Sequence, residues 1–370
     1  MGTPDFAVPC LDMLYSEGFD IAAVITRADK PKGRGGILTA PPVKLRALEL
    51  GLMVLQPEKV RTKEFEALVS SFSPDLIITV AYGKILPLSI LCIPKSGCIN
   101  VHASLLPAYR GAAPINHAII NGDNKTGITT MFMDEGMDTG DILIQEDIEI
   151  GEEMDAGQLH DALAAMGSSV LRHTLERLEA GTLCRLPQDH SRATSAPPLH
   201  RDSGLVDWVK PARAIHNLIR GTRPWPAAYT YHSGIRMKIW QSSEDMGTVL
   251  MSARPTSVPA SASVPAPASA SASASASVSA SALAPAPSDM DTTIPADMRT
   301  VPMSAASAAD SATPGTILAT SPAGLLVVTG GSGAILLKEI QYESGKRLKL
   351  NDCWHNFKIG DLLTGGVTVE

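Results

Sequence analysis

Short runs of apolar residues alternate with helically spaced ones along the first half of the chain. Residues 21–26 and 75–81 are continuous apolar runs, which are typical of strands buried on both faces of a parallel sheet. Between them, the sequence predicts a helix that begins at Pro41 or Pro42 and ends at Gly51. The alternation continues with two strands and a long amphipathic helix, at residues 98–103, 127–133 and 158–180. This order of elements predicts an α/β fold with a Rossmann-like parallel sheet.

The pattern changes after residue 203, where short strands and turns replace the α/β alternation. A helix that carries Ile215 and Leu218 leads into a turn and two strands. Residues 315–341 then predict three strands joined by turns at residues 321–324 and 330–333. Several short strands with glycine turns predict a small OB-like β-barrel domain that follows the α/β domain.

Residues 251–312 interrupt the predicted barrel. They consist almost entirely of Ala, Ser, Pro, Thr and Val, without an aromatic residue and with six charged ones. Such a segment cannot bury enough apolar surface to order itself, so we expect a disordered insertion. The predicted organisation is an α/β domain at 1–188, a linker at 189–203, and a barrel domain made of 204–250 and 313–370.

Charge is distributed unevenly along a chain whose formal net charge is −7. Residues 131–180 hold thirteen acidic and two basic side chains, whereas residues 200–250 hold seven basic and four acidic ones. A polyanion such as RNA would be attracted to the second region and repelled by the first. Five cysteines without a CxxC pair argue against a disulfide framework and favour a reducing, cytoplasmic setting. No apolar run approaches the ~20 residues of a membrane helix, so no membrane contact is expected.

The start of the chain raises a question about the predicted sheet. Residues 2–7 are typical of a turn between a strand and a helix, but no strand precedes them in the sequence. Either the native chain starts upstream of Met1, which we favour, or the sheet lacks a strand that should be central.

Asn100 and His102 form the first candidate site, because residues two apart on a strand point to the same face. Ligands of open α/β sheets bind at the carboxyl ends of the strands. Asp138 follows from a separate glycine-flanked loop. An amide donor, an imidazole and a carboxylate suit acyl transfer, since they can stabilise an oxyanion, move a proton and orient the imidazole. The spacing alone is equally compatible with a buried Asn and His that tie loops together and with Asp138 as a turn cap.

A metal site is the less favoured interpretation of the same region. Asp134, Asp138 and Asp141 lack the ligand density of a calcium loop, so no metal is predicted.

Six segments carry a resemblance to a known family. Read in order, they are GTPDFAV, TRADKPKGRGG, AYGKILP, GCINVHASLLPAYRGAAPINHAI, DEGMDTGDIL and IRGTRPWPAAYT. Over residues 1–250 and 313–370 the chain resembles the methionyl-tRNA formyltransferase family, whose members depend on 10-formyltetrahydrofolate. The fourth segment is specific to the folate-dependent transferases, and its run RGAAPI together with the C-terminal domain points to the tRNA enzymes among them.

The resemblance implies a formyltransferase domain followed by a tRNA-binding OB-like barrel. It implies that formyl passes from 10-formyltetrahydrofolate directly to the amino group of methionine on initiator Met-tRNA, in a cytoplasmic, bacterial-type monomer without metal. The residues implied for catalysis, for folate contact and for tRNA contact are, respectively, Asn100, His102 and Asp138; Ser104, Leu105, Leu106 and Pro107; and Lys32 and Arg34. Asn100 and His102 would hold the oxyanion, and Asp138 would assist the proton transfer.

Two other interpretations remain open. A sister enzyme could use the same folate-binding half to formylate a nucleotide sugar or glycinamide ribonucleotide, or to hydrolyse formyltetrahydrofolate. Alternatively, a non-catalytic RNA-binding protein could retain a degenerate enzyme domain. The basic entry to the C-terminal domain argues against the first interpretation, and the intact Asn100, His102 and Asp138 argue against the second.

Overall fold

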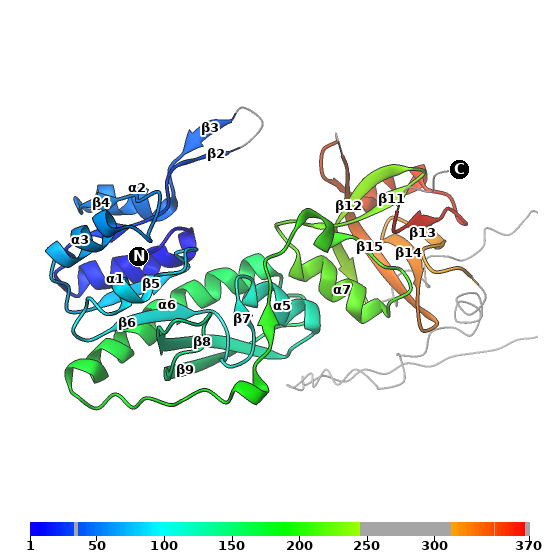
Figure 1. Cartoon of the computed structure of the whole chain (residues 1–370). Helices are drawn as coiled ribbons and strands as arrows, with labels where there is room; N and C mark the ends of the chain where they lie inside the picture. The colour runs from blue at the N-terminus through cyan, green and yellow to red at the C-terminus, as the bar shows by residue number, and fades with distance from the viewer. Residues whose placement is uncertain (33–35, 245–311, 344, 367–370) are drawn as a thin grey trace, which may run out of the picture.

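The computed structural model describes residues 1–32, 36–244, 312–343 and 345–366, and it confirms the α/β fold of the first domain. β1 (Val24–Ile25) pairs in parallel with β4 (Val54–Leu55), and β5 (Ile77–Val80) pairs in parallel with β6 (Cys98–His102). β8 (Lys125–Phe132) and β9 (Ile142–Glu149) extend the sheet beyond β6, and each runs antiparallel to the strand before it. The sheet is therefore parallel around β5 and β6 and mixed towards one edge (Figure 1).

Helices cover both faces of this sheet, as a buried parallel sheet requires. On one face pack α1 (Val8–Ser16), α2 (Pro42–Glu49), α5 (Pro114–Asn121) and α6 (Ala156–Glu179). On the other face pack α3 (Lys63–Ser71) and α4 (Leu88–Leu91). The start of α6 is fixed by a capping box, in which Asp155 and Gln158 each accept the other's backbone N–H.

The alternation of side chains along β6 determines which residues reach the site. Ile99 and Val101 are buried in the cluster that contains α1 and α6. The other three residues of the strand point to the opposite face. Among these, Cys98 packs in the cluster with α3 and α4. Asn100 and His102 follow it towards the carboxyl end of the strand.

Met1 and Gly2 occupy the position between β1 and β5. The Gly2 N–H donates to the carbonyl oxygen of Ile25 (3.0 Å), and the Val80 N–H donates to that of Met1 (2.9 Å). Gly2 also forms a parallel bridge to Val80, so these two residues connect the halves of the sheet. A cavity of about 560 Å³ lies beside them, lined in part by residues 19–25 and 72–78.

The second domain is the predicted antiparallel β-barrel. Its strands follow the order β13, β14, β15, β12, β11 and β17, with the short β16 paired to β15. They are β11 (Ala228–His232), β12 (Ile235–Ser243), β13 (Ile317–Ser321), β14 (Gly324–Thr329), β15 (Gly333–Tyr342), β16 (Leu348–Lys349) and β17 (Leu363–Thr364). A bridge between Thr316 and Leu362 joins the residues next to β13 and β17, which are the two end strands in this order. The edges of the curved sheet therefore meet.

One helix of the second domain makes the contact with the first. α7 (Ala212–Gly221) packs along α5, as Figure 1 shows. The Arg220 guanidinium donates from Nη1 to the carbonyl oxygens of Gly151 (2.9 Å) and Met154 (3.0 Å). Arg220 is only 7 % exposed, so the two domains meet through a buried polar contact.

The predicted insertion at 251–312 lies outside the described residues, apart from residue 312. β12 and β13, which flank it, belong to one sheet, as expected for an insertion into a barrel. The exact domain boundaries stay predictions. In the ranges that the structure describes, no helix is both long and apolar enough to cross a membrane.

Candidate active site

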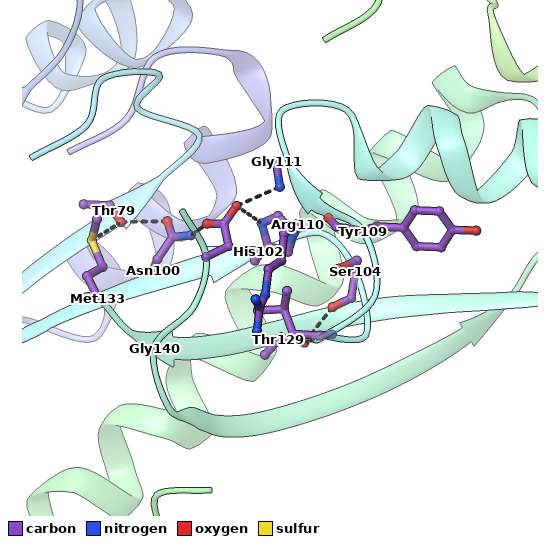
Figure 2. Close-up of polar contacts among 12 residues, drawn as sticks. Thr79, Asn100, His102, Ser104, Tyr109, Arg110, Gly111, Thr129, Met133 and Gly140 are labelled. Atoms are coloured by element: carbon purple, nitrogen blue, oxygen red, sulfur yellow. Dashed lines mark hydrogen bonds and ion pairs between the residues drawn. The ribbon is translucent and has the colours of Figure 1, made fainter. Parts of the chain in front are cut away.

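β5 and β6 bring the first polar side chains of the site together. Thr79 and Asn100 are register partners on the two parallel strands, and the Thr79 hydroxyl donates to Asn100 Oδ1 (2.7 Å). His102 lies two residues further along β6 and is 6 % exposed. Figure 2 shows these residues directed into one region at the end of the two strands. The structure thus places Asn100 and His102 on a shared face, as their spacing predicted.

Asp138 comes from the loop between β8 and β9, which is folded on itself. The Asp134 carboxylate accepts hydrogen bonds from the Gly136 N–H (3.1 Å) and the Thr139 hydroxyl (2.6 Å). Asp138 has a φ of +54°, in the left-handed region that few residues other than glycine adopt. The loop therefore holds Asp138 in an uncommon backbone conformation next to β6.

Three groups converge on the Asp138 carboxylate. Asn100 Nδ2 lies 3.5 Å from Oδ1, and His102 Nδ1 lies 3.7 Å from Oδ2. The Gly111 N–H donates to Oδ2 at 2.9 Å. The carboxylate side chain is 17 % exposed, so it remains accessible while most of its surface is covered. An amide donor and an imidazole therefore lie against one carboxylate, a set of groups that suits acyl transfer.

The backbone around His102 determines which ring nitrogen carries the proton. Nε2 lies 2.9 Å from the carbonyl oxygen of Tyr109, which can only accept a hydrogen bond. The proton of a neutral ring is therefore assigned to Nε2. Nδ1 then presents its lone pair towards Asp138, where it can take up a proton and afterwards donate as a cation.

The loop at residues 104–107 is held by its own contacts. Ser104 is fully buried, and its hydroxyl donates to the carbonyl oxygen of Ala108 (2.6 Å). Leu106 is 3 % exposed, whereas Leu105 and Pro107 are partly buried. The loop can offer a ligand the partly exposed faces of Leu105 and Pro107, while Ser104 and Leu106 form its frame.

The described residues on either side of the predicted basic loop pair as a hairpin. β2 (Lys30–Lys32) pairs with β3 (Ile37–Thr39), and the hairpin projects from the α/β domain in Figure 1. Lys32 lies opposite Ile37, which is 73 % exposed, and Arg34 lies outside the described residues. The structure does not bring this hairpin into contact with Asn100, His102 or Asp138 in the described part of the chain.

Three groups that touch the site carry no signal in the sequence pattern. Thr79 contacts Asn100, the Gly111 N–H contacts Asp138, and Gln188 contacts the Asp138 loop from a distant segment. A backbone N–H has no residue type to reveal it, and one Thr or Gln in its stretch of chain is not distinctive. The register between β5 and β6 is the signal that could have indicated Thr79.

The three aspartates of the β8–β9 loop do not share a site. Asp134 accepts a hydrogen bond from Thr139 within its own loop, and Asp138 faces His102. Asp141 accepts a hydrogen bond from Arg185 Nε (3.0 Å). Among the residues that the structure describes, no group of three or more His, Cys, Asp or Glu is arranged to hold a metal ion.

Comparison with known proteins assigns both domains. The family model described as formyl transferase matches residues 1–175, and that of the formyl transferase C-terminal domain matches residues 198–257 and 281–358. The methionyl-tRNA formyltransferase of Acetivibrio thermocellus is 44 % identical over 365 residues, which cover 98 % of each chain. That of Ruminiclostridium cellulolyticum is 54 % identical over 242 residues, 65 % of this chain and 78 % of the relative.

Solved structures share the fold at lower identity. The sugar 3N-formyltransferase WlaRD, solved with dTDP and 5-N-formyl-THF, has a TM-score of 0.51 and 20 % identity, covering 65 % of this chain and 84 % of its own. An N-formyltransferase from Helicobacter canadensis, in complex with folinic acid and dTDP-3-aminofucose, also has a TM-score of 0.51 and 20 % identity, covering 66 % and 87 %. These two structures show the fold alone, whereas the relative matched over its full length shows the family. The chain belongs to the methionyl-tRNA formyltransferase family.

Proposed function

We propose that this enzyme transfers the formyl group of 10-formyltetrahydrofolate to the amino group of methionine on initiator Met-tRNA. The convergence of Asn100, His102 and Asp138 on one space supports this proposal most strongly. The family membership supplies the formyl transfer and the Met-tRNA acceptor. The formyl donor is inferred from the family resemblance, and the individual residue roles are inferred from that resemblance together with the geometry of the site.

The amine of methionine attacks the formyl carbon, which is bonded to N10 of the folate. A tetrahedral intermediate forms, and its oxygen carries the negative charge. The Thr79 hydroxyl engages Asn100 Oδ1, so Nδ2 faces the site; one of its two N–H groups points to Asp138 Oδ1 and the other can donate to this oxygen. Such donors stabilise charge that develops only in the transition state.

The proton lost by the attacking amine has a path through His102. Nδ1 of the neutral ring accepts it, and Asp138 stabilises the resulting imidazolium from 3.7 Å. The protonated ring can donate to the oxyanion and then return the proton to N10, so that the C–N10 bond breaks with a neutral leaving amine. The N–C bond to methionine replaces the broken bond, and no further reactant is consumed.

A covalent route through the neighbouring thiol is not supported. Cys98 lies two residues before Asn100 and is 2 % exposed. Burial, with a smaller contribution from Cys92, raises the pKa of the Cys98 thiol to about 12, so it stays protonated and a poor nucleophile at neutral pH. Direct attack of the amine on the donor is the simpler route.

The two substrates would approach the site from different elements. We infer that the 104–107 loop contacts the folate through the partly exposed side chains of Leu105 and Pro107. Lys32, on the β2–β3 hairpin, and Arg34 would contact the tRNA, together with the barrel. Reversing the charge of Arg34 is then expected to weaken tRNA binding more than folate binding.

The central test compares Asn100→Ala, His102→Ala and Asp138→Ala in an assay with 10-formyltetrahydrofolate and charged initiator tRNA. Each variant is expected to fold and to lose about 10²–10³ in kcat, the usual cost of removing a transition-state donor. Two exposed residues of the same domain, His173 and Asp147, give matched alanine controls that should keep wild-type turnover. Wild-type-like turnover of any of the three site variants would refute the assignment.

The same assay, run with other acceptors, distinguishes formyl transfer to Met-tRNA from sugar formylation and from hydrolysis of the formyl donor. Formyl transfer to an amino sugar nucleotide, or release of formate to water at a rate equal to transfer, would contradict Met-tRNA as the acceptor.

A further inference from the structure

We propose that Gln188 is a positioning residue, which sets the place of Asp138 relative to His102 without touching the substrate. The inference rests on the proposed role of Asp138. It concerns a stretch of chain at residues 186–196, which we call the strap. The strap follows α6 and crosses the two loops that carry the site.

Backbone hydrogen bonds attach the strap to both loops. At its start, Leu186 and Ile142 exchange two backbone hydrogen bonds of 2.9 Å, just after the Asp138 loop. At its end, β10 (Ser195–Ala196) pairs in parallel with β7 (Arg110–Gly111). The Gly111 N–H in turn donates to Asp138 Oδ2 (2.9 Å). The strap therefore links the loop that bears the carboxylate to the loop that holds it.

Gln188 makes the corresponding link with its side chain. Its Nε2 donates to the carbonyl oxygens of Asp138 (2.9 Å) and Gly140 (2.7 Å). Its Oε1 accepts from Arg110 Nε (3.1 Å) and Nη2 (2.6 Å). Gln188 is 7 % exposed, and every N–H of its amide is used. A single buried amide thus contacts the Asp138 backbone on one side and the residue before Gly111 on the other.

This arrangement bears on catalysis because the distances at Asp138 are set by two separate loops. The carboxylate lies 3.5 Å from Asn100 Nδ2 and 3.7 Å from His102 Nδ1. A small shift of its loop would therefore move the carboxylate out of contact with both groups. A misplacement of about 1 Å can cost about 10²-fold in rate even when no catalytic group is removed. Asp138 also has a positive φ, which surrounding contacts must maintain.

Substitutions can separate position from packing. Gln188→Met keeps the length and removes all four hydrogen bonds. Gln188→Glu keeps the shape and the Arg110 contact, but it places a carboxylate oxygen against the carbonyls of Asp138 and Gly140. Gln158→Met is a control for the loss of a glutamine hydrogen bond elsewhere in the same domain, since the exposed Gln158 accepts the Asp155 N–H in the α6 capping box, outside the site.

The experiment measures kcat, KM for both substrates and Tm for each variant, using the full chain. Both Gln188 variants are expected to lose about 10–100-fold in kcat, with KM values changed less than about threefold. Gln158→Met is expected to lower Tm without changing kcat. Wild-type kcat in Gln188→Met, or a loss confined to KM, would overturn the proposal. If Gln188→Met does not fold, the comparison is made with Gln188→Glu.

A double-mutant cycle provides the readout that a merely structural role would not change. In an Asp138→Asn background, Gln188→Met is expected to cost little further kcat, because the group it positions has already been altered. A full additional loss in that background would show that Gln188 acts independently of Asp138 and would overturn the proposal. Full activity of Asp138→Asn itself would instead refute the proposed role of Asp138, so the two failures are distinguishable.

Discussion

At the scale of single residues, the orientation of Asn100 decides whether it can act as a donor. Its amide has an oxygen and a nitrogen of nearly equal shape, and only the nitrogen can stabilise an oxyanion. The Thr79 hydroxyl donates to the oxygen at 2.7 Å, which leaves the nitrogen on the side of Asp138. Thr79 is 2 % exposed and sits in register with Asn100, so water cannot easily replace it.

Thr79→Val tests this orientation, because valine has the same shape without the donor. We expect about a tenfold loss in kcat, which corresponds to the ~1–1.5 kcal/mol of one hydrogen bond. Thr79→Ser keeps the hydroxyl and should retain most of the activity. Steady-state kinetics of the two variants test whether the hydroxyl is needed. Equal kcat values for Thr79→Val and Thr79→Ser would contradict the role of Thr79.

The cysteines offer a second residue-scale prediction. Burial raises the pKa values of Cys10 and Cys98 to about 12, whereas Cys92 and Cys184 are exposed. Because the thiolate is the reactive form, only the two exposed thiols should react rapidly with an aromatic disulfide reagent at pH 8. The buried thiols of Cys10, Cys98 and Cys353 should react slowly, at the rate at which the protein unfolds. Rapid modification of Cys98 in the folded enzyme would show that the β6 cluster opens.

Much of the site could be predicted at this scale, and the reason is geometric. Asn100 and His102 fall together because a strand repeats every two residues, whereas Asp138 joins them through the chemistry of the set, which the family resemblance supports. The positions of Thr79, Gly111 and Gln188 depend on contacts between distant segments. No local period or spacing in the sequence encodes such contacts.

At the scale of elements, the strap shows how a predicted linker contributes to the site. Residues 189–203 read as a connection between domains, yet β10 within them pairs with β7. A pairing of two residues on each side is too short to produce an alternating pattern in the sequence. The antiparallel direction of β8 was also invisible, because apolar runs reveal buried strands without their direction.

Gly111→Ala tests how closely the strap and β7 must approach. Gly111 has a φ of +121°, and a Cβ would lie 2.7 Å from the carbonyl oxygen of Ala196. We expect a loss of about 3 kcal/mol in the free energy of unfolding, together with reduced kcat, because the Gly111 N–H also holds Asp138. Gly181→Ala is the control. It has a φ of +65° in open space and should cost about 1 kcal/mol without affecting kcat. Equal effects of the two substitutions in urea unfolding would show that the close approach is not needed.

At the scale of the whole molecule, the barrel is attached to the α/β domain through α7. The sequence predicted both domains from their strand and helix patterns, but not the contact between them. His216 and Arg220 have the appearance of ordinary polar residues on a helix surface, and the structure shows them 4 % and 7 % exposed at the joint. Their hydrogen-bond partners in the first domain are backbone carbonyls of residues 151–154, which have no signature in the sequence.

The joint should be sensitive to acid through His216. Its Nδ1 faces the Ser242 hydroxyl (3.0 Å) and its Nε2 faces the carbonyl oxygen of Glu152 (3.3 Å), so the neutral ring is satisfied. Burial lowers the pKa of His216 below its usual 6.5, and Arg220 adds to the effect while Glu153 and Glu244 oppose it. As the pH falls below about 6.5, the unfolded chain binds a proton that the folded chain does not bind. The stabilisation is therefore present above this pH and decreases below it, by at most about 1.4 kcal/mol per pH unit.

His216→Gln tests this dependence, since glutamine can donate to Glu152 and accept from Ser242 without titrating. The wild-type Tm is expected to fall between pH 6.5 and 5 more steeply than the Tm of the variant. His173→Gln, at a half-exposed position on α6, should keep the wild-type slope. Parallel Tm curves for wild type and His216→Gln would show that the acid sensitivity arises elsewhere. A flatter curve for the variant would show that His216, at the domain joint, contributes to the acid sensitivity of the enzyme.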